Sequence, residues 1–291
     1  PGRLRHPLRR TAPKGAADPG WERISWDEAL ELAAARLTAL AAAHGPETVA
    51  FNTASPSTSA LSDSRHWVMR LRRAFGSPNQ STSYELCGWG RWMANLYSFG
   101  SALPAGVMPD LDRAGCILLW GYNPTVSRIA HATATAAAVA RGAKLITVDP
   151  RNAGLSRRAD EWLRVRPGTD GALALGLSQV LIRNGWYDVF DRWSEICARH
   201  DPATVEALTD VPAAQVERTA ELIWTSRPLA YMTWSGLEQQ SNANPTALAI
   251  GLLYALTGDY DAPGGNVELP TVPQADVQGA DFLTLGQRAK T

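Results

Sequence analysis

Apolar residues follow two alternating patterns along the chain, short continuous runs and longer runs with helical spacing. The short runs, which predict buried strands, are residues 116–120, 144–148, 162–165 and 229–233. The longer runs, which predict helices, are residues 127–140, 170–183, 212–224 and 245–256. Strands and helices in alternation are typical of a parallel sheet covered by helices. We therefore expect an α/β fold with a doubly wound, mostly parallel, dinucleotide-binding-like sheet.

The N-terminal part of the chain has a different pattern. Residues 1–25 are rich in Pro, Gly and Arg and predict an irregular lead segment. Ser25 and Glu28 have the spacing of a capping box, which predicts a helix that continues to about residue 43. The elements expected next are a strand at 48–51, an amphipathic helix at 59–75 and a polar loop at 78–83.

These changes of pattern predict the domain boundaries. We expect a lead segment over residues 1–25 and the first part of a discontinuous second α/β domain over residues 26–85. The dinucleotide-binding-like domain would occupy residues 86–280, and residues 281–291 would be a truncated continuation.

Each predicted strand is followed by a turn with polar side chains. The candidate residues of these turns are Gly121, Asn123, Ser127, Asp149, Arg151, Gly168 and Asp170. A glycine backbone with amide and hydroxyl groups near a helix start suits a phosphate or ribose, and a carboxylate can accept hydrogen bonds from a ribose or base. Any one of these turns, taken alone, is better explained by ordinary turn and cap residues. Three of them in one parallel sheet favour a nucleotide site at its carboxyl edge.

Composition and motifs exclude several other classes. The chain has 28 basic and 28 acidic residues, so its charge gives no reason to expect nucleic acid as a partner, and no apolar run is long enough for a direct membrane span. The dinucleotide-binding fingerprint, the Walker A loop and the Gly-x-Ser-x-Gly motif are absent. The three cysteines and five histidines lack the spacing of a disulfide framework or a zinc site.

Cys87 is the cysteine with the most unusual surroundings. It lies in the sequence E-L-C-G-W-G-R, where flanking glycines allow the backbone to approach a ligand closely. On local grounds alone, a single cysteine is more often a small buried apolar residue. Cys116 and Cys197 lie inside a predicted strand and a predicted helical stretch, and we expect both in the core.

An ordered series of motifs resembles one enzyme family. R-L-R-H-P-L-R-R, W-E-R-I-S-W-D-E-A-L, C-I-L-L-W-G-Y-N-P-T-V-S and R-G-A-K-L-I-T-V-D-P-R are followed by R-P-G-T-D-G-A-L-A-L-G, S-G-L-E-Q-Q, L-T-G-D-Y-D-A-P-G-G-N and V-Q-G-A. In order and spacing these segments resemble the molybdopterin oxidoreductases of the dimethyl sulfoxide reductase and formate dehydrogenase family, from about residue 3 to residue 285.

The resemblance implies a bis(molybdopterin guanine dinucleotide) cofactor with molybdenum or tungsten, held by the domain at 86–280. Its guanosine and phosphate parts would contact the strand-end residues named above, and Gly236, Gln239 and Gln278 match further positions that line the cofactor in the family. Cys87 falls at the metal-ligand position, which makes it the expected catalytic residue. A soft thiolate suits such a metal. Its neighbours Glu85, Trp89 and Arg91 are candidates for the substrate funnel.

The expected function is two-electron redox or oxygen-atom transfer on a small-molecule substrate. A non-redox hydratase or transhydroxylase on the same scaffold, or a cofactor-free subunit that acts as a binding module, are the alternatives. Gly88 follows Cys87 where formate dehydrogenases have His, which argues against formate as the substrate. The family's iron–sulfur segment, with its 4Fe–4S cluster, and its C-terminal pterin-binding domain are expected outside this chain, which would then be a fragment.

The resemblance also implies partners. These are an iron–sulfur electron-transfer subunit and a membrane anchor subunit, in the cytoplasm or periplasm of a bacterium, with the cytoplasm favoured.

Overall fold

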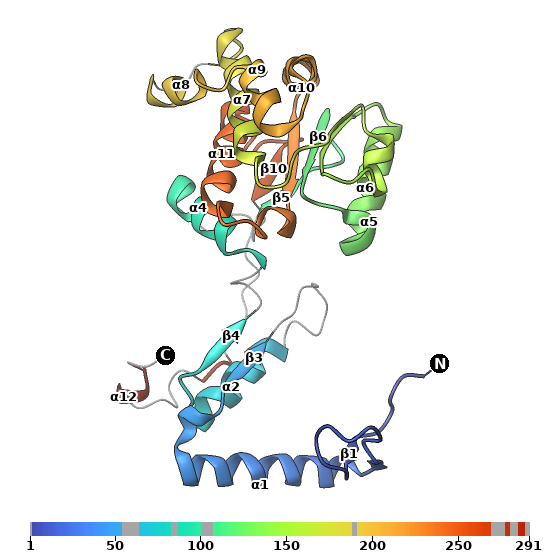
Figure 1. Ribbon diagram of the computed structural model, residues 1–291, viewed down its shortest axis with the longest axis vertical. Helices are drawn as coiled ribbons and strands as arrows, with labels where there is room; N and C mark the ends of the chain where they lie inside the picture. Colours follow the sequence, from blue (N-terminus) through green and yellow to red (C-terminus); the bar gives the residue numbers. More distant parts are fainter. Residues whose placement is uncertain are drawn as a thin grey trace. The chain divides into compact units, whose positions relative to one another are not determined.

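The computed structural model describes residues 2–53, 64–82, 87–100, 107–187, 191–268, 277–279 and 285–288 (Figure 1). The chain divides into two compact units. One contains Pro1–Ser83 and Pro273–Thr291, and the other contains Tyr84–Val272. The domain boundaries expected at residues 25, 85 and 280 stay a prediction.

The first unit begins with a hairpin rather than an irregular segment. Strands β1 (Leu8–Arg10) and β2 (Trp21–Arg23) pair antiparallel. The connection between them ends at Gly20, which has the positive φ that glycine adopts easily. The Thr11 hydroxyl donates a hydrogen bond to the Gly20 carbonyl at 2.6 Å. The Pro-, Gly- and Arg-rich composition did not predict this hairpin. Helix α1 (Trp26–His44) follows, and the predicted capping box of Ser25 and Glu28 is confirmed.

The rest of this unit contains a small parallel pair of strands and two helices among the described residues. The strand expected at 48–51 is displaced, because Pro46–Thr48 forms a 3-10 turn (η1) and β3 covers Phe51–Thr53. The loop expected at 78–83 contains strand β4 (Gln80–Thr82), which pairs in parallel with β3. Its polar side chains did not predict a strand, because the pairing uses backbone hydrogen bonds. Helix α2 (Ser64–Phe75) connects the two strands, and residues 59–63 of the predicted helix lie outside the described residues. The short helix α12 (Leu285–Arg288) also belongs to this unit.

The second unit contains the predicted parallel sheet. Among the described residues its strands are β6 (Cys116–Trp120), β7 (Lys144–Val148), β8 (Glu161–Leu163) and β9 (Leu229–Thr233), in the order β8-β7-β6-β9. Every residue of β6 is buried, which explains its continuous apolar run. Three of these strands match the predicted bounds, whereas β8 is shorter and begins one residue earlier than expected.

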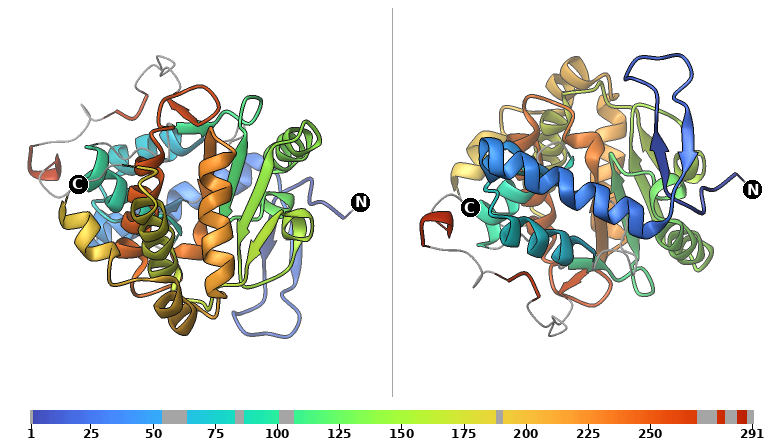
Figure 2. Two further views of the ribbon diagram at one scale, coloured as in Figure 1. Left: turned by 90° about the horizontal axis from the view of Figure 1, so that it is seen from above. Right: turned by 90° about the horizontal axis from the view of Figure 1, so that it is seen from below.

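Helices cover both faces of this sheet (Figures 1 and 2). On one face, Cys116, Leu118 and Trp120 of β6 belong to a core formed with α7 (Asp170–Arg183), α10 (Ala213–Thr225) and α11 (Ala243–Thr257). On the other face, Ile117 and Leu119 pack in a core that includes α6 (Ile129–Ala140). This alternation of neighbouring residues between two cores is the expected result of a strand's period of two.

The remaining elements of this unit surround the sheet. They are α4 (Trp89–Phe99), β5 (Val107–Pro109), α5 (Pro124–Ser127), η4 (Gly154–Arg158), α8 (Asp191–Cys197), α9 (Pro202–Thr209), η5 (Ser235–Leu237) and β10 (Asn266–Glu268). The helix predicted at 127–140 corresponds to α6, which begins two residues later because Arg128, between α5 and α6, has a non-helical backbone (φ −151°, ψ 78°).

The strand order determines where a ligand can bind. From β6 the chain proceeds to β7 and β8 on one side, and β9 then lies on the other side of β6. The chain direction across the sheet thus reverses at β6, and the helices that follow β6 and β9 pack on opposite faces of the sheet. In open parallel sheets, this switch point at the carboxyl edge is the usual ligand site. The expected doubly wound α/β fold is confirmed.

Candidate cofactor site at the carboxyl edge of the sheet

A cavity of about 390 Å³ lies at the carboxyl edge, and the segments that follow all four strands line it. We call it the strand-end cavity. Eight predicted site residues line it, namely Gly121, Asn123, Ser127, Asp149, Arg151, Asp170, Gly236 and Gln239. The other lining residues are Val126, Val148, Pro150, Val165, Pro167, Trp234, Ser235, Leu237 and Gln240. A parallel sheet thus brings together residues that are far apart in the sequence.

Two glycines allow the loops after β6 and β9 to touch. Gly121 has a positive φ of 58°, and its carbonyl accepts a hydrogen bond from the Gly236 N–H at 3.3 Å. A Cβ on Gly236 would lie 2.8 Å from the Gly121 oxygen and 2.9 Å from its Cα. A side chain at residue 121 or 236 would therefore occupy the space where the two loops meet. Exposed glycine backbone of this kind lets a phosphate group approach closely.

Asp149 and Arg151 form a compact turn after β7. The Arg151 N–H donates to Asp149 Oδ1 at 2.8 Å, and the Arg151 Nε lies 3.4 Å from the same oxygen. The Asp149 side chain is 14% exposed, whereas that of Arg151 is 72% exposed. The turn role expected for the aspartate is therefore present, and the same turn presents a cation beside the cavity.

Asp170 is a buried carboxyl at the cavity wall. It is the first residue of α7, and its Oδ1 accepts a hydrogen bond of 2.8 Å from the indole N–H of Trp120, the last residue of β6. Burial raises the pKa of Asp170 above its ordinary value, although the hydrogen bond from Trp120 opposes this shift. A buried acceptor beside a cavity is suited to bind the N–H groups of a base.

The loop after β6 supplies polar groups from its own backbone and side chains. The Thr125 hydroxyl donates to the Asn123 side-chain oxygen at 2.5 Å, and the Ser127 hydroxyl donates to the Asn123 carbonyl at 3.1 Å. A Cβ on Gly154 would collide with that side-chain oxygen at 2.5 Å. The glycine of η4 therefore leaves room for Asn123 at the rim.

The other predicted positions are not among the cavity's lining residues. Gly168 lies next to the cavity, since its carbonyl accepts a hydrogen bond of 2.8 Å from Asn242 and an added Cβ would lie 3.0 Å from the side chain of Gln240. Gln278 belongs to the first unit, and its relation to the cavity stays a prediction.

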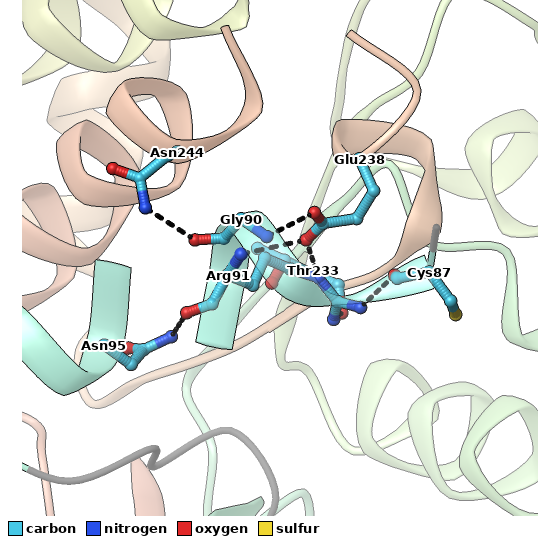
Figure 3. A network of polar contacts seen from close by, with 7 residues as sticks. All are labelled: Cys87, Gly90, Arg91, Asn95, Thr233, Glu238 and Asn244. Atoms are coloured by element: carbon cyan, nitrogen blue, oxygen red, sulfur yellow. Dashed lines mark hydrogen bonds and ion pairs between the residues drawn. The ribbon is translucent and has the colours of Figure 1, made fainter. Parts of the chain in front are cut away.

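Cys87 lies two residues before α4 and is held through its backbone carbonyl. Its carbonyl accepts a hydrogen bond of 2.8 Å from the Arg91 guanidinium, and its thiol points away from that guanidinium (Figure 3). Cys87 is partly exposed, unlike the other two cysteines. Burial raises the pKa of Cys116 and Cys197 to about 12, so both remain protonated core residues. Within the described residues, no three His, Cys, Asp or Glu side chains form a metal-binding group.

Arg91 does not line a funnel, which corrects the expectation for it. The residue is 7% exposed, and its guanidinium binds Glu238, the Thr233 carbonyl and the Cys87 carbonyl. A buried charge is stable only when it is paired and hydrogen-bonded, and these three partners satisfy the guanidinium. Trp89 is 53% exposed, and Glu85 lies outside the described residues.

Two functional candidates were missed by the sequence reasoning, Trp234 and Glu238. The guanidinium carbons of Arg128 and Arg91 lie 4.4 Å and 5.0 Å from the Trp234 ring centroid, at the wall of the cavity. Glu238 is the neighbour of two cavity residues. The only sequence signal was their place directly after a predicted strand, in the segment W-S-G-L-E-Q-Q.

The donors and acceptors of the strand-end cavity fit the dinucleotide part of a large cofactor. Its carboxyl groups can accept from base and ribose, its paired glycines leave room for a diphosphate, and Arg151 supplies a cation. Its volume lies within the usual range of roughly 300–1,000 Å³ for small-molecule sites.

Comparison with known proteins identifies the family of this chain. The family model for molybdopterin oxidoreductases matches residues 3–288. The thiosulfate reductase molybdopterin-containing subunit PhsA of Salmonella typhimurium is 31% identical over 243 residues, which cover 80% of this chain and 30% of that protein. Formate dehydrogenase H of Escherichia coli is 27% identical, over 96% of this chain and 39% of its own.

A solved structure has the same fold. Acetylene hydratase from Pelobacter acetylenicus superposes with a TM-score of 0.79 and 24% identity, over 98% of this chain and 40% of the hydratase.

The chain belongs to the molybdopterin oxidoreductase family. Members such as thiosulfate reductase and formate dehydrogenase are enzymes, and the family supports a molybdopterin cofactor. The chain spans 30% and 39% of the two curated relatives named above. Among the described residues, no helix is both long enough and apolar enough to cross a membrane.

Proposed function

We propose that this chain is the cofactor-binding part of an enzyme that performs two-electron redox or oxygen-atom transfer on a small substrate. The cofactor would be bis(molybdopterin guanine dinucleotide) with molybdenum or tungsten. The single observation that carries the proposal is the strand-end cavity, where eight residues chosen from the sequence meet at the switch point of the sheet. Family membership supports the pterin part of the cofactor.

The residues of the cavity would bind and orient one dinucleotide. Asp149 and Asp170 would accept hydrogen bonds from guanine and ribose, and the exposed guanidinium of Arg151 would pair with phosphate. Gly121 and Gly236 would let the phosphates approach the backbone. Asn123, Ser127, Gly168, Gln239 and Gln278 would complete the contacts.

Cys87 would be the metal ligand. Its thiol is partly exposed and points away from the guanidinium that holds its backbone. The deprotonated thiolate is the form of cysteine that binds metals. The bound metal centre would supply the two-electron chemistry, and the protein would supply binding and electrostatics.

The partners follow from the same proposal. One relative is named a molybdopterin-containing subunit, which supports a multi-subunit enzyme. We propose a 4Fe–4S cluster in the same protein, an iron–sulfur electron-transfer subunit and a membrane anchor subunit, located in the bacterial cytoplasm or periplasm.

The proposal is tested with Cys87→Ala in the full-length protein, produced in a host that makes the cofactor. We expect activity to fall by about three orders of magnitude or more, because the metal loses its protein ligand. Cys197→Ala is the matched control, since its thiol is a core residue. If Cys87→Ala leaves metal content and activity equal to those of the control, the proposal is wrong.

A non-redox reaction is the second candidate, because the fold is shared with acetylene hydratase. Turnover that needs no electron donor or acceptor would favour a hydratase or transhydroxylase. Absence of the cofactor would favour a binding module.

A further inference from the structure

The contacts around α4 point to a structural device that positions Cys87. We propose that Arg91 and Glu238 are positioning residues, which fix the backbone of Cys87 relative to the wall of the strand-end cavity. We call Arg91, Glu238 and the backbone groups that they bind the α4 anchor (Figure 3). The inference rests on the proposed role of Cys87 as metal ligand.

Helix α4 begins without a cap of its own. Its N-cap residue is Gly88, which has no side chain to accept the free N–H groups of the first turn. Glu238 takes this role from a distant part of the chain. Its Oε2 accepts the Gly90 N–H at 2.9 Å, and its Oε1 accepts the Arg91 N–H at 3.0 Å. A carboxylate is also favoured at a helix N-terminus by the helix dipole.

The guanidinium of Arg91 extends this cap to Cys87. Its Nε donates to Glu238 Oε1 at 2.7 Å, Nη1 donates to the Thr233 carbonyl at 3.1 Å, and Nη2 donates to the Cys87 carbonyl at 2.8 Å. The planar group thus joins the end of β9, the loop after it and Cys87, two residues before α4. Only arginine presents donors in this fixed arrangement.

The geometry leaves little freedom at this point. The side chains of Arg91 and Glu238 are 8% and 4% exposed, so water does not weaken their interaction. A Cβ on Gly90 would lie 2.8 Å from Glu238 Oε2 and 2.9 Å from the Ala243 Cβ, which explains the glycine. Asn244 donates to the Gly90 carbonyl at 3.3 Å and ties the same turn to α11.

The anchor links the two parts of the proposed site. Glu238 directly follows Leu237 and precedes Gln239, and both of these line the strand-end cavity. A shift of the loop after β9 would therefore move the backbone of Cys87 as well. The thiol itself points away from the Arg91 guanidinium (Figure 3), as its proposed role as metal ligand requires.

The first test measures hydrogen exchange in the full-length protein, with and without its metal. In Glu238→Gln the Gly90 and Arg91 amides should exchange on the order of tenfold faster, because one carboxylate oxygen becomes an NH₂ group. The matched control is Glu217→Gln, which removes the charge of an exposed carboxylate whose Oε2 lies 2.7 Å from Arg183 Nη2. It should leave these two amides unchanged. Since the single variant could fail to fold, Arg91→Met/Glu238→Gln, which leaves no buried charge, is measured beside it.

The second test measures access to the Cys87 thiol. Arg91→Lys keeps the charge but not the planar fork, so the Cys87 carbonyl should be released. In metal-free full-length protein, the limiting rate of Cys87 alkylation at high pH should then change by about threefold or more. In metal-loaded protein, the electron paramagnetic resonance signal of the half-reduced metal should broaden or split. Arg183→Lys is the control for both readouts.

The outcomes separate this inference from the proposed function. Faster exchange and altered alkylation, with metal content and activity both unaffected by Cys87→Ala, would support the anchor and overturn the metal-ligand role. Exchange and alkylation within twofold of wild type in Glu238→Gln, Arg91→Lys and the double variant would overturn the anchor, whatever the metal content.

Discussion

The strand-end cavity and the α4 anchor belong to the same compact unit but are built in different ways. The cavity is formed by short loops at the ends of neighbouring strands, and its charged side chains make mainly local contacts, such as Arg151 with Asp149. In the anchor, contacts join residues that are 147 positions apart, and the charges are buried. The cavity therefore presents polar groups to a ligand. In the anchor, the polar groups bind one another and hold the backbone of Cys87.

The difference teaches what each region contributes. A cavity wall can change by one residue without loss of the fold, because the sheet behind it remains packed. When a buried ion pair loses one partner, the other partner remains as an unpaired buried charge, which destabilises the fold. Four substitutions, with expected effects on stability that range from large to small, test this contrast.

Arg91→Met should be the most destabilising change. It leaves Glu238 buried without its guanidinium, which costs about 3–5 kcal/mol of unfolding free energy. The double variant Arg91→Met/Glu238→Gln should recover much of this loss, because no charge is stranded. Denaturant-dependent hydrogen exchange of the β6 amides measures both. An equal loss in Arg183→Met, where the pair is exposed and is worth about 0–1 kcal/mol, would contradict the contrast.

Gly236→Ala should have an intermediate effect. The added Cβ meets the Gly121 backbone at 2.8 Å and 2.9 Å, so the loops after β6 and β9 must separate, at a cost of about 1–3 kcal/mol. Cofactor content should fall at the same time. Gly286→Ala is the control, since its Cβ would meet nothing within 4 Å. Thermal unfolding and pterin content of both variants decide whether the close approach matters.

Asp170→Asn should reduce cofactor retention while it leaves stability near neutral pH unchanged or higher. Because the pKa of Asp170 is raised in the folded protein, the unfolded chain releases this proton first as the pH increases. Wild type should therefore lose stability relative to Asp170→Asn from about pH 4 upward, until the raised pKa is passed. Unfolding measured from pH 4 to 7 checks the sign. A wild type that gains stability relative to the variant over this range would contradict it.

Arg151→Gln should have the smallest effect on stability. Its side chain is 72% exposed, so its ion pair contributes about 0–1 kcal/mol. Its loss should instead weaken retention of the cofactor by on the order of tenfold, because a charge-assisted bond to phosphate disappears. Cofactor loss during dialysis at rising salt measures this effect. Arg158→Gln, which changes an exposed arginine of η4 that does not line the cavity, is the control.

The cavity could be predicted from the sequence to a large extent. The strands at 116–120, 144–148 and 229–233 were predicted from short, mostly apolar runs, and their observed bounds match, because helices cover both faces of the sheet. Once the strands are placed, residues at their carboxyl ends must meet at one edge. Asn123, Asp149 and Asp170 followed from this rule alone.

The anchor could not be predicted in this way. Nothing in the local sequence of Arg91 identifies Glu238 as its partner, since their contact depends on how α4 packs against α11 and the loop after β9. The polar strand Gln80–Thr82 was missed for a related reason. Its pairing with Phe51–Thr53 uses backbone groups, which carry no side-chain pattern.

The most direct test of the central claim is metal and pterin analysis of the full-length protein, expressed in a host that makes the cofactor. Plasma mass spectrometry measures the metal, and fluorescence of the oxidised pterin measures the organic part. We predict molybdenum or tungsten with about two pterins per chain. Protein that folds with neither metal nor pterin would contradict the account and leave the family fold without its chemistry.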